Sequence, residues 1–257
     1  MSLLYYNCLD PQPGTVNTGS VMQMPQTPER PLLHIGAGNH HAPGWINCDM
    51  FAAPNIDCVF NLTQPWPFVD DSIDGIYGSH VLEHLADHQT FFREAWRVMG
   101  NRRLMRLRVP YGGHSYAWAD PTHVRAWYPS SFAHLQPGYA QMTSNPQHLY
   151  LGAYFIVDMV SIKITRWVRE ACRWRWVFHK LIDWFERFNE AFDEIWVDLY
   201  TVKTEEDYVY WKETRGGHAF PRRYVMTQED YELWKEGEHP EVLTMFDVTR
   251  PNVGYAF

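Results

Sequence analysis

Residues able to hold a nucleoside occur early in the chain, next to a short apolar run. The run Leu32–Ile35 ends in Gly36-Ala37-Gly38, and Asp49 follows eleven positions after Gly38. Glycine lets the backbone approach a ligand closely because it has no Cβ, and a carboxylate can accept charge-assisted hydrogen bonds from both hydroxyls of a ribose. A dinucleotide site would need a third glycine and an acidic residue about 20 positions downstream. The spacing therefore favours a nucleoside ligand without a pyrophosphate, and S-adenosylmethionine (SAM) fits this description.

A histidine-rich motif, His80-Val81-Leu82-Glu83-His84, follows the fourth apolar run of the chain. It matches the H-x-x-E-H pattern, in which two histidines four residues apart on one helix face hold a zinc ion. A zinc hydrolase would need a further ligand, for which the candidates are His114, Asp120 and His123. However, the motif begins within a few residues of a strand end, where the SAM site would lie. We therefore predict no metal site, and we expect Glu83 and His84 to hydrogen-bond neighbouring loops.

A second group of polar side chains lies in the segment 111–125, after the fifth apolar run. It contains His114, Tyr116, Asp120, His123 and Arg125. A histidine titrates near neutral pH and is the commonest general base for a hydroxyl group. One hypothesis is that His114 or His123 is catalytic and removes the proton of a substrate, with Asp120 orienting it. The alternative is that Asp120 to His123 only caps a helix and packs the loop.

The elements that must position these residues alternate between strands and amphipathic helices. Apolar patterning predicts strands over 32–35, 45–49, 56–60, 72–78, 104–109, 154–165 and 195–202. Apolar residues at intervals of three and four predict helices over 89–99 and 174–192; we also expect a helix to begin in 80–88 and another over 228–236. Such alternation is typical of an α/β fold with a mostly parallel sheet, in which ligands lie beyond the carboxyl ends of the strands.

The composition of the chain restricts its partners and its location. Of the 257 residues, 30 are acidic and 22 are basic, which gives a formal net charge of −8. Basic residues concentrate only at 102–108 and 166–175, and apolar residues interrupt both stretches, so general nucleic-acid binding is not expected. The chain has no apolar stretch of the roughly 18 residues that span a membrane and no signal-peptide pattern. We therefore expect a cytoplasmic protein.

Three segments in order carry a family resemblance: LHIGAGNHHAPGWINCD (33–49), NLTQPWPFVDDSIDGIYGSHVLEHL (61–85) and FREAWRVMGNRRLMRLRVPY (92–111). Together they resemble the class I, Rossmann-like SAM-dependent methyltransferases, and most of all the predicted small methyltransferases found with surface-glycan genes. The resemblance covers about 32–132 and extends more loosely to 203. It implies helices around a sheet of seven strands, mostly parallel with the last strand antiparallel, and SAM over the ends of strands one to four.

The resemblance also implies a role for each residue at these strand ends. Gly36 and Gly38 would contact the methionine end of SAM, Asp49 the ribose, Asn61 and Leu62 the adenine, and Ser79 and His80 the methionine moiety. The predicted cofactor site further includes Ala37, Asn39 and Met50. Two positions depart from the family pattern. Asn61 stands where the family usually has Asp, and Gly100-Asn101-Arg102-Arg103 replaces the family's Lys-Pro-Gly-Gly turn.

From these observations we expect a SAM-dependent methyltransferase that releases S-adenosylhomocysteine. Its acceptor would be a hydroxylated small molecule, such as a glycan or a nucleotide sugar. The alternative is a methyltransferase-like fold that binds a ligand or partner without turnover. We divide the chain into an irregular N-terminal arm (1–31), a SAM-binding domain (32–203) and a C-terminal extension of unknown role (204–257). The helix expected over 174–192 is apolar around much of its circumference, so it is either buried or part of a homo-oligomer contact.

Overall fold

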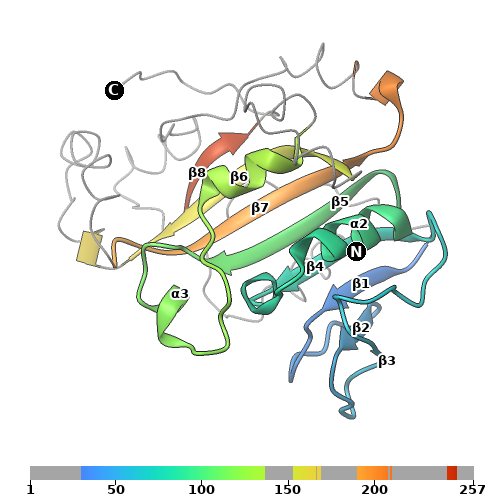
Figure 1. The fold of residues 1–257 in the computed structure, drawn as a ribbon, viewed down its shortest axis with the longest axis horizontal. Helices are drawn as coiled ribbons and strands as arrows, with labels where there is room; N and C mark the ends of the chain where they lie inside the picture. Colours follow the sequence, from blue (N-terminus) through green and yellow to red (C-terminus); the bar gives the residue numbers. More distant parts are fainter. Residues whose placement is uncertain are drawn as a thin grey trace.

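Eight strands form one sheet in the order β3-β2-β1-β4-β5-β7-β6-β8 (Figure 1). The computed structural model describes residues 30–136, 153–165, 167–168, 190–207, 209 and 242–247. The strands are β1 (Leu32–Ile35), β2 (Ile46–Asp49), β3 (Cys58–Val59), β4 (Ile73–Ser79), β5 (Met99–Pro110), β6 (Tyr154–Ile164), β7 (Phe192–Val202) and β8 (Val242–Asp247). The described helices are η1 (Leu82–His84), α2 (His88–Val98), α3 (Tyr116–Ala119) and η2 (Pro129–Leu135).

The directions of the strands follow the doubly wound pattern expected from the sequence. Each neighbouring pair from β3 to β5 is parallel, whereas β7 lies antiparallel to both β5 and β6. The predicted seven-stranded sheet with an antiparallel last strand is therefore confirmed. The C-terminal extension adds β8, which pairs antiparallel with β6 at the edge of the sheet.

The strand order reverses between β1 and β4, because the chain runs outward from β1 to β3 and then returns to start β4 on the other side. In the register of this pair, Ile35 lies opposite Gly78. Gly36, which follows β1, and Ser79, the last residue of β4, therefore lie side by side at the point where a doubly wound sheet binds its ligand.

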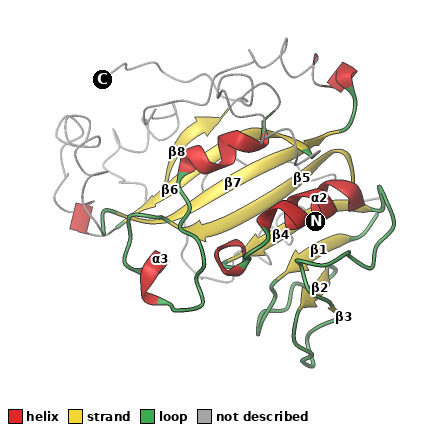
Figure 2. Ribbon diagram, in the orientation of Figure 1, coloured by secondary structure: helices red, strands yellow, loops and turns green. Residues whose placement is uncertain are grey.

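Helix α2 packs across the face of the sheet that is toward the viewer in Figure 2. Its N-cap is Asp87, whose Oδ1 accepts a hydrogen bond from the backbone N–H of Thr90 at 2.9 Å, which satisfies one of the free donors of the first turn. The buried side of the helix consists of Phe91, Phe92, Ala95 and Val98. The helix predicted over 89–99 is thus confirmed to within one residue at each end.

Other predicted elements differ from the structure or fall outside it. The helix expected to begin in 80–88 is only the single 3-10 turn η1. The helix expected over 174–192 lies outside the described residues up to position 189, and its expected last residue, Phe192, is buried and begins β7. The arm over 1–29 and the helix over 228–236 also lie outside the described residues. Among the described residues, no helix is both long enough and apolar enough to cross a membrane.

Two basic residues of β5, Arg106 and Arg108, are neutralised by acidic residues of β7. Arg106 lies opposite Asp198 in the register and holds both its carboxylate oxygens at 2.7 Å. Arg108 donates to Oε2 of Glu194 at 2.8 Å. Asp198 is fully buried, and a buried carboxylate has to be paired. The basic stretch 102–108 is therefore in large part a set of cross-strand ion pairs.

Candidate active site

The glycine loop after β1 leaves room for a ligand beside Gly38 but not beside Gly36. Gly36 and Gly38 have positive φ angles of 60° and 52°, a conformation that side chains with a Cβ rarely adopt. A Cβ at Gly36 would lie 2.8 Å from Cγ2 of Val81, so this glycine lets the loop contact the segment after β4. A Cβ at Gly38 would have no neighbour within 4 Å. Gly38 therefore borders open space, as a glycine beside a bound cofactor must.

The carboxylate of Asp49, which is predicted to bind the ribose, is fixed against this loop. Its Oδ2 accepts a hydrogen bond from the N–H of Gly38 at 2.9 Å, and its Oδ1 accepts one from the N–H of Phe51 at 3.0 Å. Each carboxylate oxygen has a second lone pair, so both can still accept a hydrogen bond from a ribose hydroxyl. Asn55 completes the loop by donating to the carbonyl of Gly38 at 2.9 Å.

The residues predicted to contact adenine, Asn61 and Leu62, follow β3, and Met50 of the predicted cofactor site follows β2. Met50 and Phe51 are exposed, with 53% and 71% of their surface accessible, and they offer apolar surface next to Asp49. The Oδ1 of Asn61 accepts hydrogen bonds from the N–H and the Oγ1 hydroxyl of Thr63, at 2.9 and 2.8 Å. Asn61 therefore presents mainly its amide N–H₂ group, which can donate to a ring nitrogen of adenine. Leu62 is partly buried against the core.

Ser79 ends β4, and His80 follows with a positive φ of 54°. The ring of His80 lies between two carboxylates: Nδ1 is 3.3 Å from Oε1 of Glu83, and Nε2 is 3.4 Å from Oε1 of Glu194. Burial alone would lower the pKa of His80, but these carboxylates outweigh it and raise the pKa to about 9. His80 is therefore an imidazolium cation at neutral pH.

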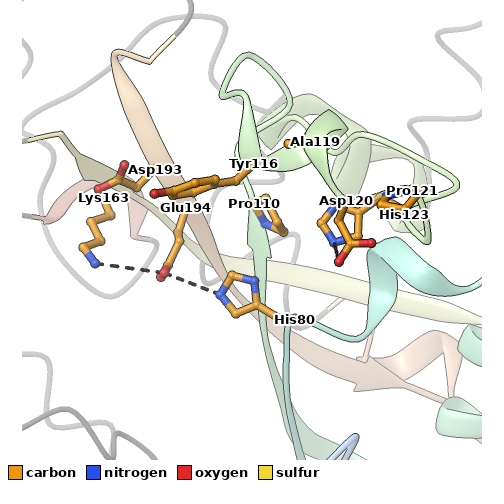
Figure 3. Close-up of a pocket in the computed structure, with 10 residues that line it drawn as sticks. All are labelled: His80, Pro110, Tyr116, Ala119, Asp120, Pro121, His123, Lys163, Asp193 and Glu194. Atoms are coloured by element: carbon orange, nitrogen blue, oxygen red, sulfur yellow. Dashed lines mark ion pairs between the residues drawn. The ribbon is translucent and has the colours of Figure 1, made fainter.

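An open pocket of about 760 Å³ begins at His80 and continues along the same edge of the sheet (Figure 3). Strands β5, β6 and β7 contribute Pro110, Lys163, Asp193 and Glu194, all at the ends that face the same way as the end of β4. Its other residues come from α3 and the loop after it: Tyr116, Ala119, Asp120, Pro121 and His123. Because Val81, the neighbour of His80, touches Gly36, the pocket adjoins the glycine loop.

Glu194 joins the charged groups of the pocket. Burial would raise the pKa of Glu194, but hydrogen bonds and charges from His80, Arg108 and Trp196 hold it well below its usual range. Its Oε1 also lies 4.0 Å from the Nζ of Lys163. The sequence prediction missed Glu194 because it placed the start of this strand at 195, whereas β7 begins at Phe192.

Of the three predicted catalytic residues, the structure places Asp120 and His123 at the pocket. His114 does not line it. The Nδ1 of His114 accepts a hydrogen bond from the N–H of Tyr116 at 3.2 Å, while its Nε2 lies 3.0 Å from Glu190 and 3.2 Å from Asp193. Both ring nitrogens are therefore engaged, and His114 is placed to fix the loop after β5 against the start of β7.

His123 has one ring nitrogen turned to its own loop and one to the pocket side. Its Nδ1 lies 3.3 Å from the carbonyl of Ala117, and its Nε2 lies 3.9 Å from Oδ2 of Asp120. The other oxygen of Asp120 accepts hydrogen bonds from the N–H and the hydroxyl of Thr122, at 2.8 and 2.7 Å; these bonds lower the pKa of Asp120. Asp120 and His123 thus both pack the loop and face the pocket.

The zinc pair considered for the H-x-x-E-H motif does not form. His80 precedes η1 with a left-handed backbone conformation, and η1 is a 3-10 turn, so His80 and His84 do not share a face of an α-helix. The ring of His80 reaches Glu194, whereas the ring of His84 packs edge-on against His123, with centroids 4.6 Å apart.

Comparisons with known proteins give one family match and several distant structural likenesses. Residues 46–102 match the model of a methyltransferase domain, whereas no curated protein sequence matches the chain. Solved structures with a similar fold include a SAM-dependent methyltransferase from Archaeoglobus fulgidus, with 16% identity, a TM-score of 0.45, and 66% of this chain and 86% of that chain covered. The YcgJ protein of Bacillus subtilis gives 16% identity and a TM-score of 0.43, with coverages of 68% and 93%.

A third similar structure is the phosphoethanolamine N-methyltransferase 2 of Haemonchus contortus in complex with SAM, with 11% identity and a TM-score of 0.41. The alignment covers 79% of this chain and 52% of that chain. Likenesses at this level carry no argument about activity. The methyltransferase-domain match over residues 46–102 and the order of the strands support a SAM-dependent methyltransferase with a Rossmann-like class I fold.

Proposed function

We propose that the chain transfers the methyl group of SAM to a hydroxyl oxygen of an uncharged, sugar-like acceptor held in the pocket of Figure 3. The observation that carries this proposal is the position of the pocket. It opens along the carboxyl ends of β4 to β6 and begins at His80, directly beside the segment that touches the glycine loop. A methyl donor over the loop and an acceptor in the pocket would therefore meet near the end of β4.

The loop and the neighbouring strand ends would hold SAM in the way that the sequence predicts. Asp49 would accept hydrogen bonds from the ribose hydroxyls, Met50 and Phe51 would cover the adenine, and Asn61 would donate to its ring edge. Gly36 to Asn39 and Ser79 would surround the methionine portion. The imidazolium of His80 directly follows Ser79, and its charge suits the carboxylate of the methionine moiety.

The charges of the pocket favour an uncharged acceptor over a nucleotide sugar. Asp120, Asp193 and Glu194 contribute three carboxylates, whereas Lys163 and His80 contribute the cations. The diphosphate of a nucleotide sugar would be repelled by these carboxylates, while the hydroxyl groups of a neutral sugar can donate hydrogen bonds to them. Tyr116, with 68% of its surface exposed, adds an aromatic face against which a sugar ring can pack.

Methyl transfer needs an acceptor oxygen in line with the sulfonium and a route for its proton. A new C–O bond forms while the S–CH₃ bond breaks, and the bonding electron pair remains on sulfur, giving S-adenosylhomocysteine. The enzyme contributes mainly alignment. We assign the removal of the hydroxyl proton to His123 and Asp120. The Nε2 of His123 faces Asp120, whereas its Nδ1 is engaged by the carbonyl of Ala117.

The test is a transfer assay with SAM that carries an isotopically labelled methyl group. A panel of neutral mono- and oligosaccharides, nucleotide sugars and amines is offered as acceptor, and S-adenosylhomocysteine and labelled product are quantified together. We expect label on a hydroxyl oxygen of a neutral sugar, in a 1:1 ratio with S-adenosylhomocysteine. Transfer to amines or nucleotide sugars alone would contradict the acceptor class. Tight SAM binding without turnover on any acceptor would favour the non-catalytic alternative. The cytoplasmic location and the homo-oligomer expected from the sequence stay predictions.

A further inference from the structure

Three possible metal ligands that are separated in the sequence meet beside the pocket. Glu83 and His84 belong to η1, and His123 comes from the loop after α3. One potential ligand atom from each residue lies within 4.8 Å of those of the other two. This set differs from the zinc pair suggested by the sequence motif, because His123 takes the place of His80.

Glu83 is the observation that points to a ligand. Its side chain is buried, with 1% of the residue exposed, and neither carboxylate oxygen has a hydrogen-bond partner among the described residues. Oε1 has only the ion-pair contact with His80 at 3.3 Å, and Oε2 has none. Burying a carboxylate is costly unless it is paired or coordinates a metal. An unsatisfied buried oxygen therefore needs a further partner in the functional protein.

The hydrogen bonds of the two histidines leave the same ring nitrogen available on each. The hydroxyl of Thr122 donates to Asp120, so its oxygen can accept from the Nδ1–H of His84 at 2.9 Å. The carbonyl of Ala117 can only accept, so the Nδ1 of His123 carries a proton as well. Both Nε2 atoms then have a free lone pair. Metal-binding histidines typically donate their other N–H to a carbonyl or a carboxylate-linked group, and these two do so.

We infer that Glu83, His84 and His123 bind one divalent transition-metal ion of the zinc class at the edge of the acceptor pocket. Two imidazoles and one carboxylate suit zinc and its first-row neighbours, whereas magnesium and calcium prefer oxygen ligands. The Oδ2 of Asp120, 3.9 Å from the Nε2 of His123, is within reach as a fourth ligand. His84 is exposed, which gives the ion a route of entry.

Binding requires a local contraction of the site. Ligand atoms around a tetrahedral zinc ion are about 3.3 Å apart, as follows from bond lengths of about 2.0 to 2.2 Å. The three residues therefore have to draw together from separations of up to 4.8 Å. The flexible partners are the rings of His84 and His123, since Glu83 is buried and fixed in η1. Ring rotation that replaces the edge-on stacking of the two imidazoles would accomplish the closure.

The ion would act beside Asp120 and His123, where the proposed function places the removal of the acceptor proton. With the Nε2 of His123 on the metal, that nitrogen no longer accepts a proton. An acceptor hydroxyl that takes the fourth coordination position in place of Asp120 would instead lose its proton more easily, because a bound cation lowers the pKa of its oxygen ligand, and the carboxylate of Asp120 would accept that proton. This role rests on the proposed function, whereas the binding of the ion does not.

The binding experiment uses the full chain without an affinity tag, stripped of metal with a chelator and dialysed. Zn²⁺ is titrated by calorimetry, and Co²⁺ is titrated while its visible d–d absorption reports the coordination geometry. We expect one ion per chain and an intense, tetrahedral-type Co²⁺ spectrum. Glu83→Gln, His84→Ala and His123→Ala should each weaken Zn²⁺ binding by at least about 100-fold, and Thr122→Val by about 10- to 100-fold, the effect typical of a second-shell change.

The matched control is His88→Ala, which removes a histidine four positions after His84 that does not belong to the set, and this variant should bind Zn²⁺ like the wild type. Circular dichroism and SAM binding by each variant establish that it is folded. The inference is overturned if the wild type binds no Zn²⁺, or if Glu83→Gln and His84→Ala bind it as the wild type does. Methyl transfer by the metal-free protein is measured in parallel. Methyl transfer by a protein that binds no metal would support the proposed function and overturn the metal site. Stoichiometric metal binding without any methyl transfer would support the metal site and contradict the proposed function.

Discussion

The ring of His80 and the carboxylate of Glu194 face each other at the mouth of the pocket, with Nε2 3.4 Å from Oε1. They come from strands that are not neighbours, since β5 lies between β4 and β7. Arg108 of β5 completes the group by donating to the other oxygen of Glu194 at 2.8 Å. Ion pairs therefore connect the ends of three strands at the place where cofactor and acceptor would meet.

The pairing of His80 makes stability depend on pH in the alkaline range. Its pKa is raised from 6.5 to about 9 in the folded state, so its contribution is fully present below pH 6.5 and is lost as the pH rises through 9. Urea unfolding of the wild type and His80→Gln between pH 6 and 10 measures this. We expect the variant to be less stable by up to about 1 kcal/mol near pH 6, because the ring is partly exposed. The difference should disappear at pH 10, and a difference that grows with pH would refute the assignment.

Asp49→Asn is expected to weaken SAM binding by about 10- to 100-fold. The amide can still accept the N–H of Gly38, but it loses the charge that strengthens hydrogen bonds to the ribose hydroxyls, a difference of about 1.5 to 3 kcal/mol. Calorimetric titration with S-adenosylhomocysteine gives the affinity. Asp70→Asn removes an exposed carboxylate before the start of β4, at the opposite edge of the sheet, and serves as the control. Equal affinities of the two variants would exclude Asp49 from the ribose site.

Gly36→Ala and Gly38→Ala distinguish a glycine that is needed for packing against Val81 from a glycine that is needed to leave space for the cofactor. Both substitutions put a side chain at a positive φ, at a cost of about 1 to 2 kcal/mol. Only the alanine at position 36 also collides with Val81. We therefore expect Gly36→Ala to lower the free energy of unfolding by a further 1 to 3 kcal/mol or so, whereas Gly38→Ala should mainly weaken SAM binding. Chemical denaturation compares the variants. The predicted contact with Val81 is wrong if both lose the same stability.

His123→Ala and His114→Ala should fail in different ways. Removing His123 is expected to lower kcat by about 100- to 10,000-fold, the usual contribution of a proton-transfer group, with SAM affinity unchanged. His114→Ala should chiefly lower thermal stability, since it removes the contacts of the ring with Glu190 and Asp193. Steady-state kinetics and melting curves on the same samples distinguish the two. If both variants keep full methyl transfer, neither histidine removes the acceptor proton.

The parts of the site that depend on local chain chemistry could be predicted from the sequence. The glycine loop and Asp49 are close in sequence, and parallel strands bring their carboxyl ends to one edge, so the contact of Gly38 with Asp49 follows from the pattern. The class of fold and the helix α2 follow in the same way from apolar periodicity.

The remaining features depend on contacts between distant segments, which periodicity does not reveal. Glu194 becomes a pocket residue only because β7 runs antiparallel, so that its first residues lie beside the last residues of β5. The proximity of His84 and His123 depends on η1 being a 3-10 turn, which turns His84 away from His80. The Asx turn in which the carbonyl oxygen of Asn61 accepts from Thr63 was likewise not predicted, because such turns depend on the local backbone conformation.

Strand β8 has a consequence for where the chain can be shortened. Its hydrogen bonds to β6 occupy the outer side of a strand that would otherwise present a row of unpaired amide and carbonyl groups to water. Open edges of this kind recruit strands from other molecules and lead to aggregation. A protein ending at residue 203 is thus expected to precipitate or self-associate, and a well-behaved truncation has to extend beyond Asp247.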